Sequence, residues 1–407
     1  MDNFQTTIFK ILGYFPFSMV DNQILFEYST KCISSPPQLP THRWKILYSR
    51  YFNRLSSTLS IIPTLFYTLV TFLIIVPLIT LQRENHTSKS AESVHSIQRY
   101  AKTSTFYVTW NFKSAIHLFC ASFVKIGMFL NRKCMHGLLT EIQILSKSLR
   151  TISGKNYRNS NKFTKELLIQ LIIFLGFITC GIFEVGLVTW HQLGITPAKF
   201  FARVTPTTIG YLHSVFSLVV LYYLNWYLEL LLEIKVLIGL KFGEIVNSMK
   251  IDSMTEILTL YARLAEQVHL FNKTFRFWVI IDMIHSLTRI IISAYYIAIM
   301  AKNTVYTVSG LCHDGMTVTL YFYLIYAVCK RGLEIEEESA EIVRKLEVIL
   351  RWMDRTKFSM IANPGKIQVN MGFFDINLRI MTTIVGTVTT YLIVLIQFQG
   401  SDRNQSE

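Results

Sequence analysis

Residues 61–81 read IIPTLFYTLVTFLIIVPLITL, an apolar run that contains no charged side chain. A helix needs about 20 mostly apolar residues to cross the hydrocarbon core of a bilayer. The composition of the 407-residue chain agrees with a membrane protein, because 51% of its residues are apolar and 16% are charged. Soluble globular chains carry about 25% charged residues. This composition argues against an ordinary soluble protein. It excludes a disordered chain, a coiled coil and a disulfide-rich secreted fold.

Six further apolar runs are long enough to span a bilayer, so we expect an all-α membrane protein with seven transmembrane helices. The run at residues 104–130 is the weakest, since Lys113 and Lys125 interrupt it. The remaining runs lie at residues 167–190, 204–232, 277–300, 305–329 and 376–398.

Lysine and arginine predict the orientation of these spans, because cytoplasmic loops carry an excess of both. Of the 40 such residues, 28 lie on the side that holds the N-terminus, 8 on the opposite side and 4 within spans. We therefore expect a cytoplasmic N-terminus and, with an odd number of spans, an extracellular C-terminus. The net charge of +14 is then a signal of membrane orientation, and we expect no nucleic-acid partner.

Three of the long cytoplasmic segments place apolar residues at the helical spacings of three and four. These segments cover residues 138–152, 257–271 and 342–353. Three apolar faces need one another or a partner, which predicts a compact cytoplasmic helical layer continuous with the spans. The alternative is a set of amphipathic helices lying on the membrane surface.

An acidic run follows the sixth predicted span and consists of Glu334, Glu336, Glu337, Glu338 and Glu341. Such a run can line a cation exit path. It can also form the solvated N-terminus of a helix, where carboxylates suit the helix dipole. The second interpretation is the one we favour from the sequence.

Polar side chains recur along the seventh span in steps of three and four, and with Val394 they form one stripe: Arg379, Thr383, Thr387, Thr390 and Gln397. Threonine hydroxyls in such a helix can bond to the carbonyl four residues earlier or join neighbouring helices. The stripe can also line a pore. One helix cannot enclose a pore, so this second interpretation requires several subunits around a shared axis.

Motifs for catalysis are absent from the sequence, which contains no GxSxG, HExxH, Walker A or GxGxxG pattern. The six cysteines form no CxxC pair and the histidines are scattered, so we expect no enzyme, no cofactor and no metal site. The N-terminus shows no basic region followed by an apolar core and a cleavage site, and we expect no removable signal peptide.

The end of the seventh span resembles the signature of insect gustatory receptors, which is Thr-Tyr, five hydrophobic residues and Gln-Phe. Residues 390–398 read TYLIVLIQF, and the lead-in at residues 372–377 reads GFFDIN. The N-terminal sequence GYFP at residues 13–16 is loosely similar to the family as well. The length, the seven spans and the inverted topology extend the resemblance to the whole chain.

The resemblance implies a homotetramer, or an assembly with related receptor subunits, that forms a ligand-gated, non-selective channel for Na⁺, K⁺ and Ca²⁺. It implies a plasma-membrane receptor of sensory neurons in contact with membrane lipid. Each seventh helix would line the pore, with Phe398 as a hydrophobic plug and Gln397 as a polar ring at the extracellular gate. Thr390 and Tyr391 would pack or line the pore below them. Thr383, Thr387 and Val394 complete the expected pore face.

The family's ligand pocket lies in the outer half of spans two to six, where apolar walls with a few convergent polar groups suit a small-molecule tastant. The candidate ligand-binding residues are Tyr107, Trp110, Glu184, Trp190, His191, Tyr211, His213, Tyr295, Tyr296, Tyr306, His313 and Asp314. Trp110, Trp190 and Tyr306 also suit the aromatic belt at a membrane interface.

Charged residues inside spans are costly and are usually paired or functional. Lys113, Glu184 and Arg289 are of this kind, and Glu184 with Arg289 is one candidate pair. The residue after the Thr-Tyr pair is Leu392, whereas sugar-tuned members of the family often carry glutamate there. This departure favours a bitter tastant or another small non-volatile molecule, with a fructose-type sugar receptor as the alternative.

A G-protein-coupled receptor is the next hypothesis, but it would have its N-terminus outside and the motifs Asp/Glu-Arg-Tyr and Asn-Pro-x-x-Tyr, which do not occur at the expected places. A secondary transporter would show internal repeats or broken helices. The sequon Asn85-His86-Thr87 falls in the first expected outer loop and predicts glycosylation at Asn85.

The expected organisation has five parts. Residues 1–55 form a cytoplasmic segment, and residues 56–330 hold spans one to six with the ligand pocket. Residues 331–370 form a cytoplasmic anchor helix, residues 371–399 the pore helix and residues 400–407 an extracellular tail.

Overall fold

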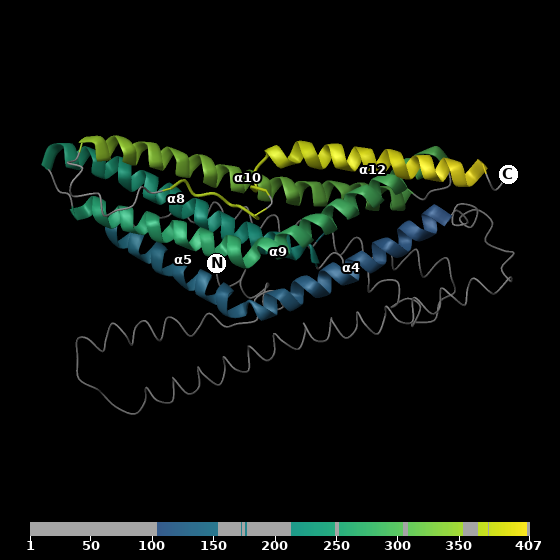
Figure 1. The fold of residues 1–407 in the computed structure, drawn as a ribbon, viewed down its shortest axis with the longest axis horizontal. Coiled ribbons are helices and arrows are strands. Elements are labelled where there is room, and N and C mark those ends of the chain that lie inside the picture. The colour runs from purple at the N-terminus through teal and green to yellow at the C-terminus, as the bar shows by residue number, and fades with distance from the viewer. Residues whose placement is uncertain are drawn as a thin grey trace, which may run out of the picture.

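The computed structural model describes residues 104–153, 172, 176, 213–248, 252–303, 308–352, 365–372 and 374–404. Within these residues the chain is all-helical, and the only strand-like feature is an isolated antiparallel bridge between Asn370 and Asp375. The named helices are α4 (Ser104–Leu130), α5 (Arg132–Ser153), α8 (Val215–Ser248), α9 (Asp252–Asn303), α10 (Val308–Trp352) and α12 (Arg379–Asn404). They run along the long axis of an elongated molecule (Figure 1).

Two of the helices are much longer than a bilayer is thick. α9 has 52 residues and α10 has 45. At 1.5 Å per residue these helices are about 78 and 68 Å long, against a hydrocarbon core of about 30 Å. The amphipathic segment at 257–271 and the predicted span at 277–300 therefore lie on one uninterrupted helix. Likewise, α10 contains the amphipathic segment at 342–353 as far as Trp352. It also contains the predicted span at 305–329 from Val308 onward.

Three of the described helices are long and apolar enough to cross a membrane. The stretches are Val215–Leu240 in α8, Thr255–Ile299 in α9 and Arg379–Phe398 in α12. α4 coincides with the expected second span, and within its described residues lies a shorter apolar stretch, Phe119–Leu130, which contains Lys125. The expected spans at 61–81 and 167–190 lie outside the described residues, apart from the single positions 172 and 176.

The amphipathic segments pack their apolar faces against one another. Leu138, Leu145, Ile257, Leu264 and Ile342 are each at most 1% exposed and belong to one core. α8 also contributes to this core, and the four helices α5, α8, α9 and α10 lie together at the end of the molecule away from the C-terminus (Figure 1). These apolar faces are therefore buried within the protein, which agrees with the expected packed layer of helices. The alternative of separate amphipathic helices on a membrane surface does not fit this burial.

Aromatic side chains fill the centre of this core. The ring of Tyr223 on α8 lies 5.1 Å from that of Phe275, and the rings of Phe271 and Phe275 on α9 lie 4.7 Å apart. The Tyr223 hydroxyl donates a hydrogen bond to the Met135 carbonyl at 3.2 Å, which ties α8 to α5. The other halves of α9 and α10 extend beyond this packed layer.

Candidate pore helix and buried polar cluster

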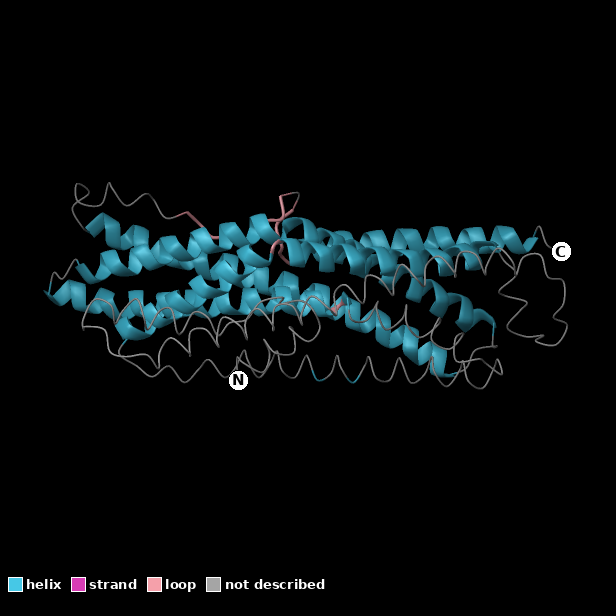
Figure 2. Cartoon of the chain, turned by 90° about the horizontal axis from the view of Figure 1, so that it is seen from below, coloured by secondary structure: helices cyan, strands magenta, loops and turns pink. Residues whose placement is uncertain are grey.

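The segment before α12 is extended and is fixed to the layer of α5, α8, α9 and α10. In Figure 2 it is the loop at mid-length of the molecule. The backbone N–H of Ile367 donates to the buried Ser339 hydroxyl on α10 at 2.7 Å. Two α9 side chains donate to its carbonyls, Tyr261 to Gly365 at 3.1 Å and Asn272 to Gln368 at 2.9 Å. Both long helices therefore hold the segment that leads into α12.

A tight reversal at residues 370–376 follows, and it explains the GFFDIN lead-in. Gly372 has φ of +83°, a backbone conformation that glycine adopts without steric cost. The Asn370 side chain donates to the Asp375 carboxylate at 2.6 Å, and its carbonyl accepts from the Gly372 N–H. The Ile376 N–H donates to the Val369 carbonyl at 2.8 Å, which closes the reversal.

α12 begins at a cap rather than at residue 376, where the apolar run starts. The Asn377 side chain accepts a hydrogen bond from the Arg379 N–H at 3.1 Å. This is the geometry of an N-cap, in which a side-chain oxygen satisfies an N–H of the first turn. Ile376 precedes this cap and lies outside the helix, and its N–H closes the reversal. At its other end α12 continues past Phe398 to Asn404, so residues 400–404 are helical.

One side of α12 packs on the protein and the other is exposed. Ile384 is buried, and Leu392 and Leu395 pack against a small cluster on α9 made of Ile292, Tyr295 and Tyr296. The most apolar stretch of α12 is 6% buried, against 89% for that of α8. A transmembrane-length helix thus has few fully buried residues, and most residues of its apolar stretch are exposed.

All seven expected pore residues lie on α12. Phe398 is 60% exposed, Tyr391 57% and Val394 37%, while Thr383, Thr390 and Gln397 are exposed and Thr387 is half-buried. The Thr390 hydroxyl donates to the Gly386 carbonyl four residues earlier at 2.9 Å. The back-bonding interpretation therefore holds for this threonine, and it leaves the oxygen lone pairs available on an exposed surface.

The expected ligand residues are placed unevenly. His213, Tyr295, Tyr296 and Asp314 are buried, and His313 is half-buried. Tyr295 and Tyr296 lie together, with ring centroids 5.7 Å apart. Tyr107 and Trp110 lie on α4, but their side chains are outside the described part of the structure. Five further candidates lie wholly outside it: Glu184, Trp190, His191, Tyr211 and Tyr306. Asn85 is outside it too.

Two charged side chains within the expected spans, Arg289 and Lys113, lie near aromatic rings. The Arg289 guanidinium lies 5.7 Å from the ring centroid of Tyr321 on α10. The Lys113 ammonium on α4 lies 5.3 Å from the ring centroid of Tyr296 on α9. Cation–π contacts of this kind stabilise a cation that has lost water. The suggested partner of Arg289, Glu184, is outside the described residues.

A buried polar cluster lies between α8 and α9, and of its members reasoning from the sequence had singled out only His213, as a ligand-binding candidate. The His213 Nε2 atom lies 3.3 Å from the Asp282 carboxylate, and the Ser217 hydroxyl donates to the same carboxylate at 2.5 Å. The ring of His285 lies edge-on to that of His213, with centroids 4.4 Å apart. The signal in the sequence was the spacing of Asp282, His285 and Arg289 by three and four residues within an apolar run.

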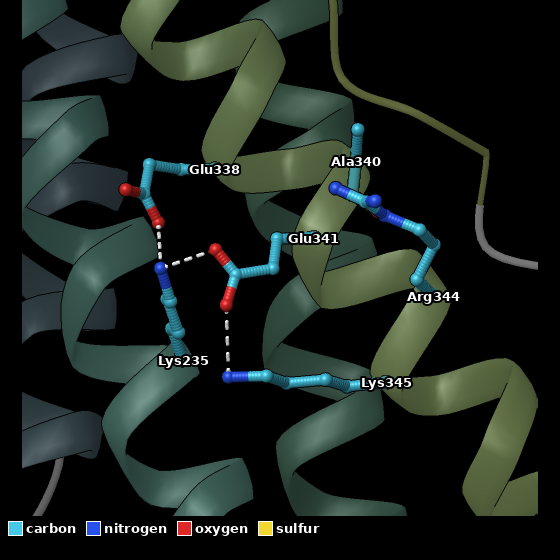
Figure 3. Close-up of polar contacts among 6 residues, drawn as sticks. All are labelled: Lys235, Glu338, Ala340, Glu341, Arg344 and Lys345. Atoms are coloured by element: carbon cyan, nitrogen blue, oxygen red, sulfur yellow. Dashed lines mark hydrogen bonds and ion pairs between the residues drawn. The ribbon is translucent and has the colours of Figure 1, made fainter.

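The acidic run lies in the middle of α10, so the interpretation as a helix N-terminus is wrong. Lys235 on α8 contacts Glu338 at 2.7 Å and Glu341 at 2.5 Å, and Lys345 contacts Glu341 at 3.0 Å (Figure 3). Hydrogen bonds from Lys235 and Lys345 lower the pKa of Glu341 below its usual 4.5. These carboxylates join α10 to α8, and this pairing does not suit a cation exit path.

Two further acidic residues of the run, Glu334 and Glu336, are also paired in the described structure. Glu334 accepts from Arg331 at 2.5 Å, and Glu336 pairs with Lys366 of the extended segment. The hydrogen bond from Lys366 lowers the pKa of Glu336. The run therefore fixes both α8 and the segment before α12 to the same helix.

Together these features define an all-helical membrane protein with a transmembrane-length helix exposed along a hydroxyl-bearing stripe. Residues 4–401 match the family model described as 7tm chemosensory receptor, and the chain belongs to that family. The resemblance carried by residues 390–398 is thus confirmed at the level of this receptor family. No curated protein matches the chain in sequence.

Solved structures of an insect olfactory receptor share the fold. OR5 from Machilis hrabei is similar with a TM-score of 0.61 and 13% identity, covering 96% of each chain. The same receptor in complex with eugenol gives a TM-score of 0.57 and 12% identity, again over 96% of each chain. At this identity the likeness shows the fold alone.

Proposed function

We propose that the chain is the subunit of a tastant-gated, non-selective cation channel in the plasma membrane of chemosensory neurons. The observation that carries this proposal is the exposure of α12. Its stretch Arg379–Phe398 has the highest mean hydropathy of the three transmembrane-length stretches, 1.7, yet it is 6% buried. Four copies around one axis would cover this surface and enclose a pore.

The exposed stripe on α12 has the chemistry that a cation pathway needs. Thr383, Thr390 and Gln397 present hydroxyl and amide oxygens, which can replace part of the water around Na⁺, K⁺ or Ca²⁺. Phe398 is a large apolar side chain at the far end of the stripe and is 60% exposed. Four Phe398 side chains, one from each subunit, would form a hydrophobic constriction that closes by losing its water.

Coupling between ligand and gate would pass through the contact between α9 and α12. Leu392 and Leu395, which lie in the same helical turns as the gate residues, pack on the cluster that contains Tyr295 and Tyr296. Both tyrosines are buried candidates for the ligand pocket. A ligand that moves this part of α9 would therefore move α12. The fixed segment before Arg379 would hold the other end of the pore helix still.

The ligand class that fits best is a small organic molecule other than a sugar. A relative of the same fold was solved with eugenol. Leu392, where sugar-tuned relatives often carry glutamate, makes an apolar contact with the α9 cluster. Bitter tastants are the first class to test, and a fructose-type sugar is the alternative.

The test is the whole-cell current of cells that express this chain alone, with G-protein signalling blocked, during a panel of bitter compounds and sugars. We expect a ligand-evoked cation current whose gating changes in Gln397→Ala and Phe398→Ala. Ile396→Ala is the matched control, since Ile396 is 43% exposed but lies about 100° round the helix from Gln397. A current that vanishes under the G-protein block would favour the receptor alternative, and substrate-coupled uptake without a channel current would favour a transporter.

The inverted topology is tested in the same cells. A tag on the N-terminus should be cytoplasmic, and Asn85 should carry a glycan that Asn85→Gln removes. An N-terminal tag detected outside intact cells would contradict the proposal. Native mass spectrometry of the purified protein would report whether this chain alone forms a tetramer or needs related subunits.

A further inference from the structure

We propose that His213, Asp282 and His285 form a binding site for a divalent transition-metal ion of the zinc type, at the contact between α8 and α9. One nitrogen of each imidazole and one carboxylate oxygen of Asp282 all lie within 4.8 Å of one another. The side chains are 0%, 6% and 0% exposed, so the site is enclosed by protein. This inference goes beyond the channel proposal and does not depend on it.

The distances suit one shared ion. Imidazole nitrogens and carboxylate oxygens lie about 2.0–2.2 Å from zinc, which places two ligand atoms of a tetrahedral site about 3.4 Å apart. The His213 Nε2 atom and the Asp282 Oδ1 atom are already 3.3 Å apart. The remaining separations are within 4.8 Å, so binding of one ion would bring these ligand atoms closer together. Three protein ligands leave one coordination position open for water or another small group.

The helix geometry presents the ligands as a set. Asp282 and His285 are three residues apart on α9, and residues at this spacing share one face of a helix. His213 precedes α8, and Ser217 lies one turn further along on the same side. Two adjacent turns of one helix therefore meet two adjacent turns of the other. An ion at their centre would link α8 to α9.

Ser217 orients the carboxylate for this role. Its hydroxyl donates to Asp282 Oδ2 at 2.5 Å, while Oδ1 is the oxygen that faces His213. Groups that hydrogen-bond a metal ligand fix its direction, and their loss typically lowers metal affinity. Imidazole with one carboxylate favours zinc, copper, nickel or iron over magnesium or calcium, which prefer oxygen ligands alone.

Arg289 carries a positive charge near the proposed site, and this charge would repel a bound metal ion. It lies one turn beyond His285 on α9, and its guanidinium lies 5.7 Å from the ring centroid of Tyr321. The Tyr321 ring in turn lies 5.7 Å from that of His285. The Arg289 guanidinium thus lies near an aromatic ring, while Asp282 Oδ1 lies beside the His213 imidazole.

The experiment is the metal content of the purified full-length chain after EDTA treatment, addition of Zn²⁺ and removal of unbound ion. We expect about one zinc per chain, and the same value for His269→Ala, which removes an exposed histidine of the same helix. Asp282→Asn and His285→Gln, which keep the size and polarity of the side chains, should lose the ion. Ser217→Ala should weaken zinc binding about 10–100-fold.

A second readout does not depend on loss of binding. His285→Cys replaces one ligand by a thiolate, so Co²⁺ bound to this variant should show a thiolate-to-metal charge-transfer absorption that the wild type lacks. Size-exclusion chromatography and circular dichroism of each metal-free variant establish that it is folded. A wild type without zinc, zinc retained in Asp282→Asn and His285→Gln, or a folded His285→Cys that gives no thiolate absorption with Co²⁺ would each overturn the proposal.

Discussion

Gly332 on α10 lies directly against the backbone of Ile376, so closely that a Cβ atom on the glycine would be 1.9 Å from the Ile376 carbonyl oxygen. The contact joins the middle of a 45-residue helix to the reversal that precedes α12. Only a residue without a side chain permits this approach. The start of the candidate pore helix is therefore positioned by α10.

Gly332→Ala is expected to destabilise the protein by about 1–3 kcal/mol, the usual cost of overpacking a filled interior. The added methyl group must displace backbone, which cannot rotate away as a side chain can. Thermal unfolding in detergent measures the effect. Gly239→Ala on α8 is the control, because a Cβ there meets nothing within 4 Å. Equal melting temperatures for the Gly332 variant and the wild type would contradict the contact.

Ser339→Ala is expected to cost about 1–3 kcal/mol, because the Ile367 N–H would lose a buried hydrogen-bond acceptor. The Ser339 hydroxyl accepts from that N–H at 2.7 Å, and both groups are buried. Thr259→Ala is the matched control, since its hydroxyl donates only to the Thr255 carbonyl on the exposed side of α9. Hydrogen exchange of the Ile367 amide should increase in the Ser339 variant and stay unchanged in the control.

Asn377→Ala is expected to lower stability by about 0.5–2 kcal/mol, because α12 would lose its N-cap. Asn377→Asp should keep most of that stability, since a carboxylate oxygen can accept from the Arg379 N–H in the same way and suits the helix dipole. Thermal unfolding of the two variants side by side decides the matter. If the alanine and aspartate variants are equally destabilised, the side chain does not act as a cap.

The pairing of Glu341 with Lys235 and Lys345 predicts a loss of stability in acid. The pKa of Glu341 in the folded protein is below its usual 4.5. The contribution of this carboxylate is therefore complete above about pH 4.5 and is lost as the pH falls through the lower, folded value. Melting temperatures measured down through this range should decrease, and less steeply in high salt because both partners are partly exposed.

Glu341→Gln should flatten this acid-dependent change and lower the melting temperature at neutral pH. Glu337→Gln removes the same charge from an exposed position of the same run and serves as the control. If the two variants have the same melting temperature at every pH, the ion pairs in Figure 3 do not contribute to stability.

Much of the architecture was predictable because it rests on local periodicity. The stripes at 138–152 and 257–271 identified buried faces correctly, since spacings of three and four place side chains on one side of a helix. Length and apolarity alone were sufficient to predict that 376–398 forms a helix. Its start at Arg379 depends on the Asn377 cap, which an apolar run does not reveal.

Contacts between distant residues could not be read from the sequence. Lys235 lies 103 residues from Glu338, and Ser217 lies 65 residues from Asp282. Whether such residues meet depends on how helices rotate and tilt against each other, which the length of an apolar run does not fix. This is why the acidic run was placed at a helix end, and why the cluster around Asp282 was not expected.

The most direct measurement of the central claim is the modification of single cysteines on α12 during ligand-evoked current. Gln397→Cys should be modified by a charged thiol reagent applied from outside, and the current should change, because the proposal places residue 397 in the ion pathway. Ile396→Cys and the unsubstituted chain, with its own exposed Cys134 and Cys312, should keep their current. A current that is insensitive at position 397 but altered at 396 would contradict a pore lined by this face of α12.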